Sequence, residues 1–227
     1  TPDTQATNRL LIIVHHLAMD GMSWRILLDD LEILLGGLMN NEPVSLGLKS
    51  ASYRQWYNAL EKYGSSQRLL SQRAFWQKIV KREVTLPVDN DYNGRVRIQD
   101  MAQHVVKLGA DQTRLLLQEV PRAYQTQIND ILLSALAKTL TDYTGTSDMI
   151  IAMEGHGRED ISPDIDTSRT VGWFTSLYPV LLEVNKAKGT EDLIKSVKEQ
   201  LRRVPDKGLG YGVLRHINKQ PGFEGKD

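Results

Sequence analysis

Residues 9–21, RLLIIVHHLAMDG, decide the fold of this chain because they join a short apolar run to a loop of ionisable residues. The run over residues 9–14 is continuous, β-branched and brief, which is typical of a strand buried on both faces. A helix with an apolar face is expected after the loop, capped by Ser23 and ending near Gly36 and Gly37. The first unit is therefore a strand, a polar loop and a helix.

The remainder of the chain mixes predicted helices and strands. Helices are expected over residues 53–64, 67–81, 111–119, 128–140 and 190–203, with Pro121 interrupting the third and a buried apolar stripe on the fourth. Strands are expected over residues 103–108, 149–153, 171–174 and 178–184, an exposed connection over 83–100, and a glycine-rich loop over 207–212. This order indicates an α/β or α+β fold.

Composition excludes several functional classes. Basic and acidic residues both number 28, so the net charge is zero and no basic stripe points to a nucleic-acid partner. The absence of cysteine excludes disulfides, thiolate metal sites and cysteine nucleophiles. The longest apolar run is too short to cross a membrane, and no secretory signal opens the chain. We expect a cytoplasmic protein without a membrane partner.

The first predicted strand is followed by a loop that carries His15, His16 and Asp20. Adjacent residues that leave a strand point to opposite faces, so the two histidines are expected to differ, one turned into the protein and one toward a cavity. Histidine titrates near neutral pH and can take and give a proton. Asp20 is expected to fix the loop through an ion pair with Arg158, and Gly21 to permit a turn. The alternative is a pair of structural histidines, and no third ligand supports a metal site.

A second polar junction follows the strand predicted over residues 149–153. Glu154 comes after four apolar residues and before a glycine. Such surroundings would disfavour the ionised carboxylate and raise its pKa, which suits proton transfer. The alternative is an ordinary loop glutamate. Gly155 and Gly157 permit a tight loop but match no phosphate-binding motif.

Five segments resemble a known family. HHLAMDG fits the HHxxxDG pattern shared by condensation and epimerisation domains of nonribosomal peptide synthetases and by related acyltransferases, and this pattern alone leaves all of these activities open. The segments that resemble epimerisation domains more than condensing ones are HHLAMDGMSWRIL (15–27), EVPRAYQTQINDILLSAL (119–136), EGHGRE (154–159), RTVGWFTSLYPVLL (169–182) and KGLGYGVLR (207–215). They follow the family's order and cover nearly the whole chain.

The resemblance implies the α/β fold of chloramphenicol acetyltransferase, in which two lobes of mixed sheets flanked by helices meet at a tunnel. Residues 1–108 would be the C-terminal part of the N-lobe, and residues 109–227 an incomplete C-lobe. Only 14 residues precede His15, and the family's FNYLG-like segment has no match after Gly212. We therefore expect a domain truncated at both ends, poorly stable or inactive by itself.

The resemblance also implies an activity. The substrate would be an aminoacyl or peptidyl thioester on the 4′-phosphopantetheine of a peptidyl carrier domain upstream in the same synthetase, and the chain would need no cofactor of its own. His16 and Glu154 match the family's acid/base pair, which inverts Cα from L to D in antibiotic biosynthesis. His15, Asp20, Gly21 and Arg158 would support that pair, and neighbouring synthetase modules would be further partners.

Three aromatic residues have competing interpretations. The spacing of Trp24 and Trp173 favours buried core positions. The resemblance permits these two residues, and also Tyr211, to line the substrate tunnel. Two other functions stay open. One is a condensation domain in which His16 assists amine attack, and the other is a catalytically silent domain that only docks carrier domains.

Overall fold

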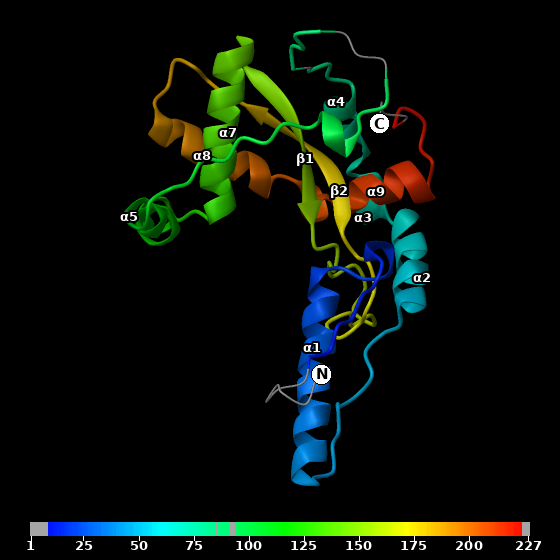
Figure 1. Cartoon of the computed structure of the whole chain (residues 1–227). Helices are drawn as coiled ribbons and strands as arrows, with labels where there is room; N and C mark the ends of the chain where they lie inside the picture. Colours follow the sequence, from blue (N-terminus) through cyan, green and yellow to red (C-terminus); the bar gives the residue numbers. More distant parts are fainter. Residues whose placement is uncertain (1–8, 85, 91–93, 224–227) are drawn as a thin grey trace. The chain divides into compact units, whose positions relative to one another are not determined.

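A computed structural model describes residues 9–84, 86–90 and 94–223 (Figure 1). The described chain divides into two compact units, each assembled from separate stretches of sequence. Unit 1 comprises residues 9–73, 154–178 and 208–223, and unit 2 comprises the described residues of 74–153 and 179–207. The division into lobes at residue 108 stays a prediction.

Unit 1 consists mainly of helices. They are a 3-10 helix (His16–Ala18), α1 (Gly21–Asn40), α2 (Tyr53–Gly64), α3 (Gln67–Leu70), α9 (Leu209–Gly212) and a π turn (Val213–Ile217). The side chain of Asp20, rather than the expected Ser23, caps α1, and the helix runs through Gly36 and Gly37 to a left-handed Asn41. Ser52 and Gln55 form a capping box at the start of α2.

The core of unit 1 forms around Trp56, Phe174 and Leu209, which are all buried. Residues 209–212 were expected to be a glycine-rich loop, but they form the helix α9. A Cβ atom at Gly210 would lie 2.2 Å from Oε1 of Gln72 and 2.9 Å from Leu69, both buried, so close packing rather than a loop favours glycine there.

Unit 2 holds most of the one sheet found in the described residues. Its elements are α4 (Arg73–Val80), a 3-10 helix (Ile98–Asp100), α5 (Ala110–Arg114), a π turn (Leu115–Glu119), α6 (Val120–Tyr124), α7 (Ile128–Thr144), β1 (Asp148–Gly155), β2 (Ser176–Glu183) and α8 (Thr190–Arg202), with a turn at Pro205–Gly208 in which Asp206 and Lys207 are left-handed. The helix over residues 110–124 passes Pro121 without a break, and the π turn at Leu115–Glu119, where the α-helical hydrogen-bond pattern is interrupted, lies just before this proline. The helix expected over 67–81 is instead divided into α3 and α4.

The buried face of α7 differs from the expected one. Leu132 and Leu136, on the predicted apolar stripe, are 49% and 41% exposed. The buried positions are Asp130, Ser134, Ala137 and Thr141. Burial of the apolar stripe was therefore wrongly predicted for the part of the chain that the structure describes.

Three predicted strands are not strands. Residues 9–14, 103–108 and 171–174 have no strand pairing among the described residues, where β1 and β2 pair only with each other. A strand requires a ladder of hydrogen bonds to a neighbour, which an apolar run cannot supply by itself. In residues 171–174 the backbone groups bond instead to the side chains of Ser23, Asp20 and Tyr53 and to the backbone N–H of Asp20. None of the described helices is long and apolar enough to cross a membrane.

Candidate active site

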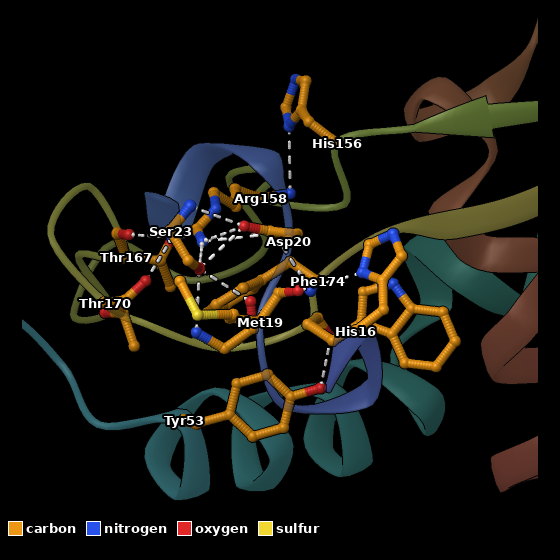
Figure 2. A network of polar contacts seen from close by, with 12 residues as sticks. His16, Met19, Asp20, Ser23, Tyr53, His156, Arg158, Thr167, Thr170 and Phe174 are labelled. Carbon is orange, nitrogen blue, oxygen red and sulfur yellow. Dashed lines mark hydrogen bonds and ion pairs between the residues drawn. The ribbon is translucent and has the colours of Figure 1, made fainter. Parts of the chain in front are cut away.

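The ion pair between Asp20 and Arg158 is the centre of the polar network in unit 1 (Figure 2). The Nη2 atom of Arg158 lies 3.1 Å from Oδ1 and 3.3 Å from Oδ2 of Asp20, and both side chains are at least 93% buried. This confirms the predicted pair. It joins the loop before α1 to the loop after β1, so the two polar junctions of the sequence meet within one unit.

Ser23 contributes more than the sequence indicated. Its buried hydroxyl lies 2.8 Å from Oδ1 of Asp20 and accepts hydrogen bonds from Nη2 of Arg158 at 3.1 Å and from the backbone N–H of Gly172 at 3.0 Å. An Asp followed three residues later by Ser at the start of a helix indicates only a cap. The spacing therefore predicted helix capping only, and it did not indicate that the Ser23 hydroxyl joins Asp20, Arg158 and Gly172.

The environment of Asp20 keeps its carboxylate ionised. Burial raises the pKa of Asp20, but the backbone and hydroxyl groups of Ser23, the backbone N–H of Phe174 and the positive charge of Arg158 together hold that pKa below its usual value. Asp20 is therefore an anion at neutral pH and fixes the loop rather than donating a proton.

Arg158 also organises the segment that follows it. Its Nη1 atom donates to the carbonyl oxygens of Thr167 at 2.7 Å and Thr170 at 2.8 Å. The guanidinium carbon lies 3.8 Å from the centre of the Phe174 ring, a cation–π arrangement. One buried side chain thus ties together the Asp20 loop and residues 167–174.

The two histidines make different contacts. The Nδ1 atom of His15 accepts a hydrogen bond from the backbone N–H of Leu17 at 3.1 Å. The Nδ1 atom of His16 lies 3.0 Å from the carbonyl oxygen of Met19. A carbonyl can only accept, so Nδ1 of His16 carries the hydrogen, and Nε2 of the neutral ring keeps a free lone pair. This tautomer is what a general base requires.

One part of the histidine prediction is wrong. Both His15 and His16 are exposed, so neither turns into the protein. The argument assumed alternation at a strand end, but residues 9–14 are not a strand and His16 begins a 3-10 helix. The choice between the two rings rests on their hydrogen bonds rather than on strand geometry.

Glu154 lies near the end of β1 and its side chain is exposed. The apolar surroundings expected for it are therefore not found. His156, two residues later, accepts the backbone N–H of Arg158 at Nδ1 and contacts the carboxylate of Glu159 through Nε2, each at 3.1 Å. These two contacts shape the loop beside Glu154.

The predicted aromatic residues have different surroundings. Trp173 is 38% exposed, so its interpretation as a core residue is wrong, and its ring centre lies 6.0 Å from that of His16. Trp24 is half-buried on α1. Tyr211 is buried on α9, where its hydroxyl accepts a hydrogen bond from Arg215. The tunnel-lining role of these three residues stays a prediction.

Gly157 is the glycine that the site requires. Its φ is +70°, and a Cβ atom there would lie 1.6 Å from the carbonyl oxygen of Phe174. Gly21, in contrast, begins α1 without a positive φ, and a Cβ atom there would meet nothing within 4 Å. The expected need for glycine at Gly21 therefore has no structural basis in the described residues.

We expect Gly157→Ala to lower the free energy of unfolding by about 3 kcal/mol, because it adds a clash with backbone and left-handed strain. Gly21→Ala is the matched control and is expected to change stability by less than about 0.5 kcal/mol. Urea unfolding of both variants measures the difference. Equal stabilities would contradict the close approach of residues 157 and 174.

Metal ligands are not gathered at this site. No three His, Asp or Glu side chains lie together in a way that would hold a metal ion, within the described ranges of the chain.

Comparison with known proteins gives consistent matches. A sequence model described as Condensation domain matches residues 4–226. Bacitracin synthase 1 of Bacillus licheniformis is 42% identical over 94% of this chain, which spans 4% of that protein. Bacitracin synthase 2 of the same organism is 39% identical over 97% of this chain and 8% of that protein.

Two solved structures are also similar. The epimerization domain from the third module of tyrocidine synthetase B is 39% identical, with a TM-score of 0.79 over 90% of this chain and 46% of that chain. The first condensation domain of the CDA synthetase is 21% identical, with a TM-score of 0.67 over 84% of this chain and 41% of that chain. The chain thus spans less than half of either structure, and the likeness confirms the predicted acyltransferase-like α/β fold class.

Proposed function

This chain belongs to the condensation-domain family, and we propose that it epimerises, from L to D, the Cα centre of a carrier-bound aminoacyl or peptidyl thioester. The observation that carries the proposal is the greater similarity to the tyrocidine epimerization domain, at 39% identity, than to the CDA condensation domain, at 21%. The thioester would be held on the 4′-phosphopantetheine of a peptidyl carrier domain in a nonribosomal peptide synthetase. That carrier and the neighbouring modules are the proposed partners.

The reaction is a proton transfer with no net change in composition. A thioester carbonyl makes the neighbouring Cα–H acidic, and a base removes this proton to leave a planar enolate. An acid then returns a proton to the opposite face, which inverts the centre. Two groups that can each hold one proton are therefore sufficient.

His16 is the first of these groups. Its Nδ1–H is directed to the carbonyl oxygen of Met19, so Nε2 is available to take or return the Cα proton. The short 3-10 helix that begins at His16 ends where the buried Asp20–Arg158 pair fixes the chain. The ion pair and the caps of α1 thus position the imidazole, and this is the supporting role proposed for Asp20 and Arg158.

Glu154 is the second group. Its exposed carboxylate stands near the end of β1, in the same unit as His16, and His156 shapes the loop that follows it. One member of the pair takes the proton from Cα and the other returns one. His15 supports the loop through its contact with Leu17.

A two-carrier assay separates epimerisation from condensation. The complete polypeptide that contains this sequence is given an upstream carrier loaded with an L-aminoacyl group and a second carrier loaded with an acceptor amino acid. We expect D-aminoacyl thioester to form with or without the acceptor, and Glu154→Gln to abolish it. Amide formation without inversion would indicate a condensing enzyme, and neither product would indicate a silent docking domain; either result would overturn the proposal.

A further inference from the structure

The hydroxyl of Tyr53 holds the peptide of Trp173. It donates a hydrogen bond of 2.6 Å to the carbonyl oxygen of Trp173 (Figure 2). The Tyr53 ring also packs edge-on against Phe174, with 5.0 Å between ring centres, and it fills the space that a side chain at Gly172 would need. Tyr53 thus contacts three successive residues of this segment.

The rest of the segment is fixed from the other side by the start of α1. The N–H of Gly172 donates to the Ser23 hydroxyl, and its carbonyl accepts from the backbone N–H of Asp20. The N–H of Phe174 donates to the Asp20 carboxylate at 3.2 Å. Of these anchors, the Tyr53 hydroxyl is the one that holds the Trp173 carbonyl.

The side chain of Trp173 lies beside His16. Their ring centres are 6.0 Å apart, with 40° between the ring planes. The imidazole is held in turn by the carbonyl of Met19. The Trp173 indole is therefore the aromatic neighbour of the His16 imidazole.

We propose that Tyr53 is a positioning residue, whose hydroxyl fixes the Trp173 peptide so that the indole stays beside His16. This inference rests on the proposed function, because the imidazole beside Trp173 is the one that would take or return the Cα proton. In this proposal Tyr53 acts through Trp173 and not on the reacting atoms.

The state of the phenol suits this role. Burial raises the pKa of Tyr53, and the negative charge of Asp20 raises it further, against a smaller opposing effect of Arg158. The hydroxyl therefore keeps its hydrogen at neutral pH and remains a donor to the Trp173 carbonyl.

Tyr53→Phe tests the positioning, since it removes the hydroxyl and keeps the ring that packs on Phe174. In the complete polypeptide we expect kcat for epimerisation to fall about tenfold, as loss of a single hydrogen bond would allow, while KM changes less than about twofold. Tyr57→Phe is the matched control, because Tyr57 lies on the same helix α2, is 47% exposed and loses the same group. It is expected to leave both constants unchanged.

A spectroscopic measurement reports on Trp173 directly. The complete polypeptide is labelled with 5-fluorotryptophan, and the four tryptophans of this 227-residue sequence contribute four of its ¹⁹F resonances. The resonance that disappears in Trp173→Phe is the one that belongs to Trp173. We expect this resonance to shift in Tyr53→Phe, and also in His16→Asn because the neighbouring imidazole is lost. It is expected to stay in place in Tyr57→Phe.

The two measurements test separate parts of the proposal. A Trp173 resonance that does not move in Tyr53→Phe would overturn the positioning, whatever the activity. A shifted resonance with unchanged kcat would overturn the claim that positioning matters for the reaction. If the unmodified protein epimerises nothing, the proposed function fails, and so does the catalytic part of this inference, while the resonance still decides whether Tyr53 holds Trp173 beside His16.

Discussion

Cα proton exchange slows about 10³-fold when His16 is replaced by asparagine, for the substrate enantiomer, L or D, whose Cα proton His16 removes. The amide N–H of asparagine occupies the position of Nδ1 and can keep the hydrogen bond to the carbonyl of Met19. The basic Nε2 is lost. The measurement is deuterium incorporation at Cα of the carrier-bound L and D substrates, taken separately under single-turnover conditions with the complete polypeptide.

His216→Asn provides the control for this variant. His216 is exposed in the π turn of unit 1 and belongs to no part of the candidate site. Its replacement is expected to leave the exchange rate within about twofold. Retention of more than a tenth of the rate by His16→Asn with both enantiomers would exclude His16 from the acid/base pair.

Asp20→Asn is expected to lower the free energy of unfolding by about 3–5 kcal/mol, because it leaves the buried Arg158 guanidinium without its counter-charge. Asparagine remains a good helix cap, so the loss comes from the charge and not from the start of α1. Asp30→Asn is the matched control. Asp30 pairs with Arg169 where both side chains are more exposed, and its loss is expected to cost about 0–1 kcal/mol. Urea unfolding compares the two, and equal losses would contradict the central position of the Asp20–Arg158 pair.

Asp20→Asn also tests how the contribution of Asp20 to stability depends on pH. Although burial alone would raise the pKa of Asp20, its hydrogen bonds and the Arg158 charge hold it below the unfolded value of about 3.9. At a pH between the folded and the unfolded pKa of Asp20, the folded state therefore binds fewer protons than the unfolded state. The contribution of Asp20 is fully present above about pH 4 and is lost as pH falls through the folded pKa. The stability difference between the native protein and Asp20→Asn should shrink accordingly below pH 4, and a constant difference would contradict this ionisation.

Local signals in the sequence predicted several elements well. Ser52 and the apolar face after it predicted α2, and the apolar runs before Glu154 and Asn185 predicted β1 and β2. Residues 9–14 and 103–108 carry equally strong strand signals but form no strand in the described residues. A strand depends on its neighbour, which a local pattern does not contain.

The candidate site was likewise only partly predictable from the sequence. Charge and position were enough to predict that Asp20 pairs with Arg158. The roles of Ser23 and Tyr53 were missed, because a serine in a first helical turn indicates a cap and a tyrosine on an amphipathic helix indicates packing. Their partners Gly172 and Trp173 lie 149 and 120 positions further along the chain. Only the folded chain brings these groups together.

The most direct test of the proposed activity starts from both enantiomers. Carrier domains loaded with the L-aminoacyl or the D-aminoacyl group are incubated separately with the complete polypeptide in D₂O. We predict that both reactions reach the same D/L ratio and that each inverted product carries one deuterium at Cα. Thioesters that keep their configuration and take up no deuterium in either reaction would contradict Cα epimerisation by this protein.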